Sequence, residues 1–130
     1  MLPRSSEWGF SSIQVTPEQQ ARYALRTHLS NVLSGVPVTE WYEWRDSRPG
    51  ASDSEAHFGL IDYHGKDKPA IQALKDILPF IRDDVAERRL PLPDPRDFVL
   101  LLRRKDDKHA LLFWTTREAS EAGARLKAGG

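Results

Sequence analysis

The fold class is decided by the stretch TPEQQARYALRTHLSNVLSGVPVTEWYEW, which begins at Thr16 and ends at Trp44. Thr16 is a suitable helix N-cap, Pro17 occupies the first helical position, where its missing N–H costs nothing, and Gln19 completes a capping box. Apolar residues then follow at helical spacing, and Gly35 stands where a left-handed residue commonly ends a helix. We therefore predict a helix that begins at Pro17 and ends just before Gly35.

The residues after this helix favour a strand. β-Branched and aromatic side chains dominate residues 37–44, which is typical of a strand buried on both faces. A second short extended segment covers residues 57–62, and a helix then starts at Pro69 with an apolar face that continues to Leu78. We expect Pro79 to kink or end that helix.

An extended segment at residues 2–7 precedes these elements, so the order is strand, helix, strand, helix. This order is typical of parallel α/β units, in which neither helix can bury its apolar face without a sheet beneath it. The sequence thus predicts an α/β fold over residues 1–83.

The pattern changes after Asp84. Three prolines space a linker-like segment, and residues 98–103 and 109–116 flank a charged turn as a hairpin. Apolar side chains point to both faces of these strands, which favours a sheet sandwiched within a β-domain. We therefore predict a second, β-rich domain over residues 84–130, with a flexible tail from Ala119.

Composition excludes several classes of function. The 130 residues carry 19 basic and 19 acidic side chains, so the long-range field that recruits nucleic acid or an acidic membrane is absent. There is no cysteine, which excludes disulfides, thiolate nucleophiles and zinc–thiolate sites. The longest apolar runs are too short to span a bilayer, and no signal peptide is visible. We expect a soluble protein with no nucleic-acid or membrane partner, and its localisation stays open.

Metal and cofactor sites are not indicated either. The histidines show neither i, i+4 spacing nor a carboxylate triad, so we predict no metal and no cofactor. They are His28, His57, His64 and His109. The pair Arg88-Arg89 alternates with acidic residues, which favours a solvated charged face.

Glu7 is the strongest candidate for a catalytic residue. It follows a short extended segment and precedes Trp8, and strand ends of this kind hold catalytic groups in barrel enzymes. An isolated exposed glutamate is more often solvated than catalytic, so the surrounding motif carries the assignment.

That motif, SEWGFSS at residues 6–12, resembles the strand-seven motif of clan-A retaining glycoside hydrolases, cellulase-like and β-xylosidase-like families among them. Three later segments, VTEWYEWRD (38–46), EAHFGLID (55–62) and KDKPAIQAL (66–74), are similar to the eighth strand and closing stretch of the clan. The resemblance covers about residues 2–83.

The resemblance implies the last two βα units of a (β/α)8 barrel, running from strand seven to helix eight, followed by the start of a β-appendage. It implies a retaining O-glycoside hydrolase that acts on β-linked sugars, with an oligo- or polysaccharide substrate and with Glu7 as the nucleophile. It also implies that Trp8 and Trp44 contact the sugar, since tryptophan stacks well on a pyranose ring. Trp41 and Trp114 are instead expected in the core.

The second carboxyl that this chemistry requires is not evident. A retaining mechanism uses two carboxyls about 5–5.5 Å apart, one as nucleophile and one as acid/base. The family places the acid/base at the end of strand four, and only six residues precede Glu7. Glu40 and Glu43 are the other carboxylates nearby, and the resemblance gives them no such role. We therefore expect the chain to be inactive alone.

Two interpretations remain open. A complete barrel takes about 250 residues, so the chain is either a fragment of a glycosidase or a stand-alone module. A fragment would come from a truncated reading frame or would associate with other copies through its uncovered strand edges. Such a module would bind carbohydrate through Trp8 and Trp44 without catalysis, or would be structural.

Overall fold

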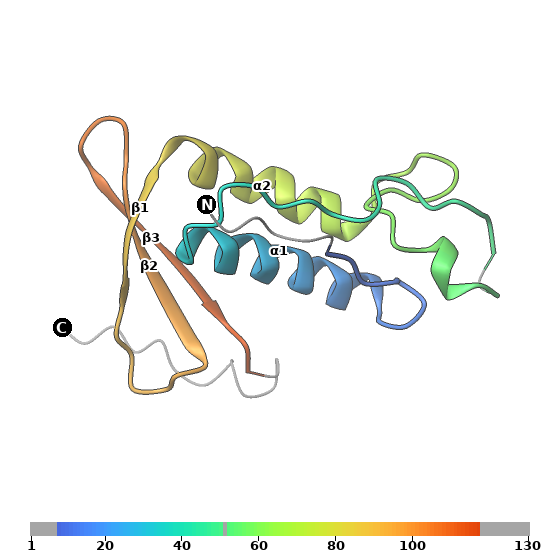
Figure 1. Ribbon diagram of the computed structural model, residues 1–130, viewed down its shortest axis with the longest axis horizontal. Coiled ribbons are helices and arrows are strands. Elements are labelled where there is room, and N and C mark those ends of the chain that lie inside the picture. Colours follow the sequence, from blue (N-terminus) through green and yellow to red (C-terminus); the bar gives the residue numbers. More distant parts are fainter. Residues whose placement is uncertain (1–7, 51, 118–130) are drawn as a thin grey trace. The chain divides into compact units, whose positions relative to one another are not determined.

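The structure is a computed structural model and describes residues 8–50 and 52–117. The chain divides into two compact units, Met1–Asp83 and Asp84–Gly130. The first unit contains two α-helices and a short 3-10 turn, and the second contains a three-stranded antiparallel sheet (Figure 1). The predicted combination of helices and strands is therefore confirmed.

Helix α1 (Pro17–Leu33) begins and ends as the sequence predicts. The Thr16 hydroxyl accepts from the Gln19 backbone N–H at 3.2 Å, and the Gln19 side chain accepts from the Thr16 N–H at 2.9 Å. These two bonds satisfy backbone donors that the first turn leaves without an intrahelical partner. Gly35, with φ of 69°, follows the helix in the left-handed conformation.

Helix α2 (Pro69–Asp83) begins where predicted and continues through Pro79, so of the two predicted effects of this proline the end of the helix is wrong. Proline removes one backbone donor from a helix and disturbs the preceding turn, but it does not by itself release the helix from its packing. Here the first half of α2 buries Ala70, Ile71 and Leu74. The packing of this apolar face offsets the loss of one hydrogen bond.

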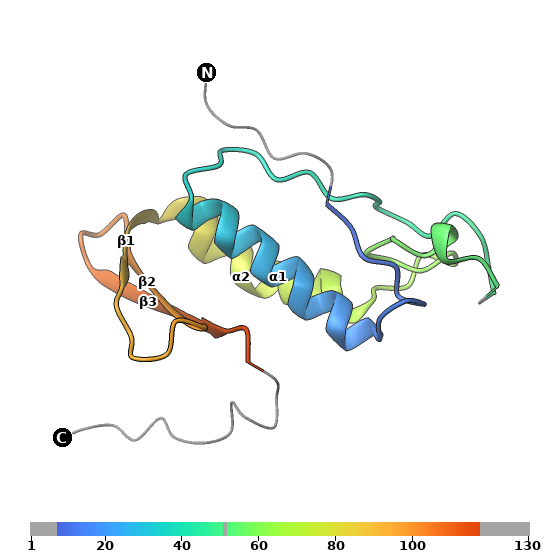
Figure 2. The same ribbon diagram turned by 60° about the horizontal axis from the view of Figure 1, so that its bottom comes forward.

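The core of the first unit lies where α1 and α2 pack side by side (Figures 1 and 2). Alanines on both helices allow a close approach, and Trp41 and Ile61 pack against the same cluster from the extended segments. The buried members are Ala21, Ala24, Leu60, Ala70, Ile71 and Leu74. The predicted core position of Trp41 is confirmed. This core carries the extended segments that hold the candidate site.

Those segments are not the regular strands that the sequence predicts. Residues 37–44 and 57–62 form only isolated bridges, parallel between Trp8 and Trp41 and between Arg45 and Ile61. The predicted burial of residues 37–44 on both faces is wrong, because Val38, Tyr42 and Trp44 are exposed. A parallel strand becomes buried on both faces only with neighbours on both sides, and the described residues give Trp41 a bridge to Trp8 alone. The predicted strand at residues 2–7 lies outside the described residues.

The second unit contains the predicted hairpin. β2 (Asp97–Arg103) and β3 (His109–Thr115) pair antiparallel, and Trp114 is buried against Phe98 with parallel rings 5.0 Å apart. The prediction that Trp114 lies in the core is therefore confirmed. One sheet face buries Leu100 and Leu102 completely, whereas the opposite face exposes Leu111 and Phe113. The structure thus shows one covered face, not the two that a sandwiched sheet would have.

The third strand, β1 (Val85–Leu90), was not predicted, because its sequence VAERRL is dominated by charge. It pairs with β2 through a register shift between Ala86 and Arg88. Arg89 is exposed, as expected for a solvated charged face, and it also makes specific contacts. Its guanidinium carbon lies 4.0 Å from the centroid of the Phe98 ring, and it donates to two backbone carbonyls. A strand of this composition is held by its neighbour and by such contacts, which sequence periodicity does not reveal.

Candidate functional site

The site is organised around the backbone of Trp8. Its N–H donates to the Glu40 carbonyl at 3.1 Å, and its own carbonyl accepts from the Tyr42 N–H at 2.7 Å. A Cβ atom on Gly9 would overlap the Tyr42 carbonyl, so glycine permits this close approach. The segment that follows Glu7 in sequence therefore lies directly beside residues 40–42. Glu7 itself lies outside the described residues.

Three aromatic side chains near this pairing are exposed. Trp8 is 39% exposed, Tyr42 46% and Trp44 62%. Tyr42 was not singled out from the sequence, although its place one residue after Trp41 could have indicated the opposite face. Its ring rests edge-on against Phe58 at a centroid distance of 5.7 Å. Aromatic rings held with one face open to solvent are the type of surface on which sugars stack.

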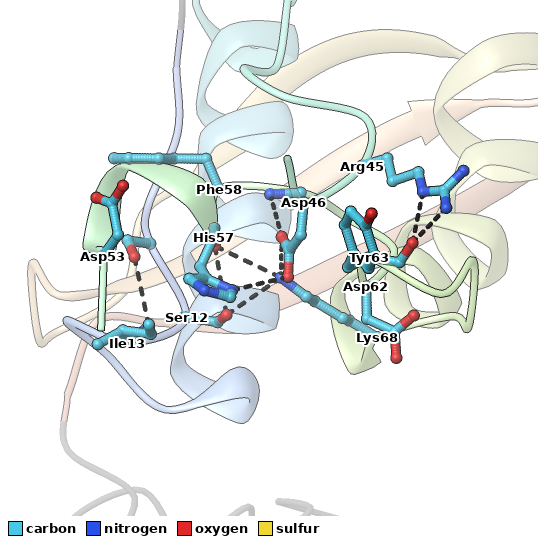
Figure 3. A network of polar contacts seen from close by, with 12 residues as sticks. Ser12, Ile13, Arg45, Asp46, Asp53, His57, Phe58, Asp62, Tyr63 and Lys68 are labelled. Carbon is cyan, nitrogen blue, oxygen red and sulfur yellow. Dashed lines mark hydrogen bonds and ion pairs between the residues drawn. The ribbon is translucent and has the colours of Figure 1, made fainter. Parts of the chain in front are cut away.

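A buried cluster of polar side chains lies beneath these segments, centred on Asp46 (Figure 3). Asp46 Oδ1 accepts from Lys68 Nζ at 2.6 Å and from the Gly59 N–H at 2.9 Å. Asp46 Oδ2 lies 3.1 Å from His57 Nδ1. Only 4% of the Asp46 side chain and 10% of the Lys68 side chain are exposed. A carboxylate this deeply buried requires such partners, because burying an unpaired charge is strongly unfavourable.

The cluster joins segments that are far apart in the sequence. Lys68 Nζ also donates to Ser12 Oγ at 3.1 Å and to the His57 carbonyl at 3.4 Å. The Ser12 N–H donates to that same carbonyl at 2.9 Å. His57 therefore has a carboxylate neighbour, Asp46, which the sequence analysis did not predict. The contact was invisible in the sequence because eleven residues of irregular chain separate His57 from Asp46.

Two further residues complete the packing around this cluster. A Cβ atom on Gly59 would lie 2.6 Å from Asp46 Oδ1 and would also overlap the backbone of Arg45, so only glycine fits there. Gln20, fully buried on α1, donates from its amide to the carbonyls of Phe10 at 2.7 Å and Gly59 at 3.3 Å. Neither role was predicted, because each depends on contacts between distant segments.

Glu43 has a carboxyl whose pKa is raised by its surroundings. Burial raises the pKa of Glu43 above its ordinary value, the Asp46 carboxylate raises it further, and the Lys68 ammonium opposes both effects. Its Oε1 is buried and has no hydrogen-bond partner among the described residues. Glu40, by contrast, is exposed. The environment of Glu43 therefore favours its protonated form.

Among the described residues, no helix is long and apolar enough to cross a membrane, and no group of side chains is arranged to hold a metal ion.

Comparison with known proteins identifies the fold. No protein-family model matches the sequence, and neither does any curated protein. Among solved structures, the chain is similar to a family 39 glycoside hydrolase from the gut symbiont Bacteroides cellulosilyticus WH2, with a TM-score of 0.78 and 23% sequence identity. The similarity covers 90% of this chain and 24% of that chain. The predicted resemblance to a glycoside hydrolase is thus confirmed at the level of the fold, and the chain spans about a quarter of the length of the protein it resembles.

Proposed function

We propose that this chain carries the nucleophile part of a retaining O-glycoside hydrolase that acts on β-linked sugars. Glu7 is the nucleophile, and Trp8 and Trp44 contact the sugar. The observation that supports this most strongly is the parallel pairing of Trp8 with Trp41, within a fold similar to that of a family 39 glycoside hydrolase. In that arrangement the residue after Glu7 lies beside the exposed aromatic side chains of the neighbouring segment.

The same proposal predicts that the chain is inactive alone. Retention needs a carboxylate that attacks the anomeric carbon and a second carboxyl that protonates the leaving group. In this proposal residues 1–83 correspond to barrel elements seven and eight, and residues 84–130 begin a β-appendage. The acid/base belongs to barrel elements that these two units do not include.

An activated substrate tests the nucleophile without the acid. Dinitrophenolate leaves without protonation, so Glu7 can attack the anomeric carbon of a dinitrophenyl 2-deoxy-2-fluoro-β-glycoside and form an ester as the C–O bond breaks. Without a base to activate water, this ester accumulates. We expect up to one equivalent of dinitrophenolate per chain and a glycosyl adduct on Glu7 by mass spectrometry. Added azide, which needs no base, should release the sugar as a glycosyl azide.

The matched controls are Glu7→Gln, which should abolish the adduct, and Glu40→Gln, which removes an exposed carboxylate of the same region and should leave it intact. A folded wild-type chain that forms no adduct at saturating reagent refutes the assignment, as does an adduct that persists in Glu7→Gln. Steady turnover of unactivated aryl β-glycosides, lost in Glu7→Gln, would show that a second carboxyl does complete the site.

The exposed aromatic side chains favour a second candidate, a carbohydrate-binding module without catalysis. Trp44 is the most exposed of them, and an exposed indole is suited to a stacking interaction with a sugar ring. In a titration with β-linked oligosaccharides, Trp44→Ala should weaken binding by about 1 kcal/mol or more, since a buried aromatic contact contributes about that much. Binding without any Glu7 adduct would favour this module, and an unchanged titration would exclude it.

A further inference from the structure

Lys68 differs from an ordinary surface lysine in that its side chain is almost fully buried. An ammonium group has three protons to donate, and Lys68 Nζ has three acceptors: Asp46 Oδ1, Ser12 Oγ and the His57 carbonyl. These acceptors belong to three different segments, and Lys68 itself stands one residue before α2. Figure 3 shows the lysine entering the cluster from the α2 side with all three acceptors around its nitrogen. Lys68 therefore joins three segments of the chain that meet at the Asp46 cluster.

Stability alone does not account for this lysine. Removing an ammonium group from water is costly, and apolar replacements of buried ion pairs are often neutral or stabilising. A buried ion pair differs from an apolar contact mainly in its directionality, because its hydrogen bonds fix where each partner must lie. Ser12 lies four residues after Trp8, and Asp46 lies two residues after Trp44. A bond from one nitrogen to both side chains therefore constrains the two segments that carry the exposed tryptophans.

We propose that Lys68 is a positioning residue of the site: its ammonium group fixes the segment of Trp8 and Ser12 against the segment of Trp44 and Asp46. This sets the separation of the side chains of Trp8 and Trp44. The catalytic consequence rests on the proposed glycosidase function, whereas the structural link does not. Lys68 contacts no substrate in this proposal and acts through the two segments it holds.

The test compares Lys68→Met with two controls. Lys68→Arg retains the charge and several donors. Lys75→Met removes a lysine of the same helical region that pairs with Asp67 at 2.6 Å, the same distance as the Lys68–Asp46 pair, but with both side chains about half exposed. The readout is hydrogen–deuterium exchange of the Trp8 and Tyr42 amides, which bond between the two segments.

We expect Lys68→Met to speed exchange at both amides by at least about tenfold relative to the amides of α1. Lys68→Arg should restore a substantial part of the protection, and Lys75→Met should have no effect. Equal changes at the two amides and throughout α1 would mean that Lys68 contributes only to global stability, and this would overturn the proposal. If Lys68→Met does not fold, Ser12→Ala tests the same link, since it removes one acceptor and should speed exchange at Trp8 while sparing Gly59.

A kinetic readout separates this proposal from the proposed function. If the fluoroglycoside labels Glu7, Lys68→Met should lower the limiting rate of labelling more than it raises the half-saturating reagent concentration, and Lys68→Arg should recover that rate. If wild type shows no labelling, the glycosidase proposal fails, and the amide exchange still decides the role of Lys68. If labelling occurs but the two amides exchange as in wild type, the positioning role fails alone.

Discussion

The ion pairs of Asp46 and Asp67 allow a matched test of how burial controls electrostatic stability in this chain. Each aspartate accepts from a lysine at 2.6 Å, but the Asp46 pair is almost fully buried and the Asp67 pair is about half exposed. Asp46→Asn preserves shape and removes the charge that faces a buried ammonium group. Losing one partner of a buried pair costs about 3–5 kcal/mol, whereas an exposed pair contributes about 0.2–1 kcal/mol.

These magnitudes predict a large difference between two chemically identical substitutions. At about 0.05–0.15 kcal/mol per residue, a unit of this size has a free energy of unfolding of roughly 4–12 kcal/mol, so Asp46→Asn should remove a large share of it. With a urea m-value of about 1 kcal/mol/M, the midpoint should fall by roughly 3 M, against less than about 1 M for Asp67→Asn. Urea unfolding followed by far-ultraviolet circular dichroism measures both values.

The double variant Asp46→Asn with Lys68→Met provides the internal control. It removes both charges, so no unpaired ion stays buried, and it should be more stable than Asp46→Asn alone. If Asp46→Asn and Asp67→Asn lower the midpoint equally, or if the double variant is less stable than the single one, burial is not the reason for the strength of this pair.

Further predictions concern the close packing, the pH response and the sheet. Gly59→Ala should be less stable than Gly35→Ala, since Gly35 has open space around it and alanine there carries only the roughly 1–2 kcal/mol penalty of the left-handed conformation; equal urea midpoints would contradict the steric argument. The free energy of unfolding should fall as pH rises through and above 4.5, because the raised pKa of Glu43 makes the folded chain bind that proton more tightly than the unfolded chain, and Glu43→Gln should flatten this fall in a pH series of urea titrations. Leu100→Ala should destabilise the sheet unit by about 2–5 kcal/mol in thermal unfolding, and a loss below about 1 kcal/mol would mean that this fully buried side chain does not pack as the structure shows.

Local signals in the sequence predicted the elements that depend on local interactions. The capping box at Thr16 fixes the start of α1 because both of its bonds span three residues, and the two strands of the hairpin are predicted from apolar segments on either side of a charged turn. Sequence patterns did not predict the structure correctly where it depends on packing against segments that are distant in the sequence. Pro79 stays within a helix because of packing that its sequence window does not contain. Residues 37–44 have the composition of a buried strand, but composition cannot supply the second neighbouring strand.

In the candidate site, too, local sequence signals could be interpreted, whereas contacts between distant segments could not be predicted. Trp8 and Trp44 were proposed from the sequence because residues 6–12 and 38–46 resemble segments of glycoside hydrolases, and their contact with a sugar stays a prediction. The partners of Lys68 were not, because Ser12 lies 56 residues away in the sequence and Asp46 lies 22. The sequence did contain an indirect signal, since Phe58-Gly59-Leu60 and Lys68-Pro69-Ala70 are among the segments that resemble the glycoside hydrolases. Their matches are explained by the backbone contacts of Gly59 and by the bonds of the Lys68 ammonium group.

The same geometry limits which carboxyl can act as the acid/base of the proposed reaction. Glu43 is the described carboxyl whose environment best suits an acid, because its pKa is raised by burial. Its unpartnered oxygen, however, is shielded from solvent, and Asp46 and Lys68 interact with its charge. A general acid must come within about 3 Å of the leaving oxygen, either directly or through one water. Because this oxygen is shielded, Glu43 is not placed to donate to a leaving group, and we expect Glu43→Gln to alter stability and its pH dependence while leaving formation of the Glu7 adduct intact.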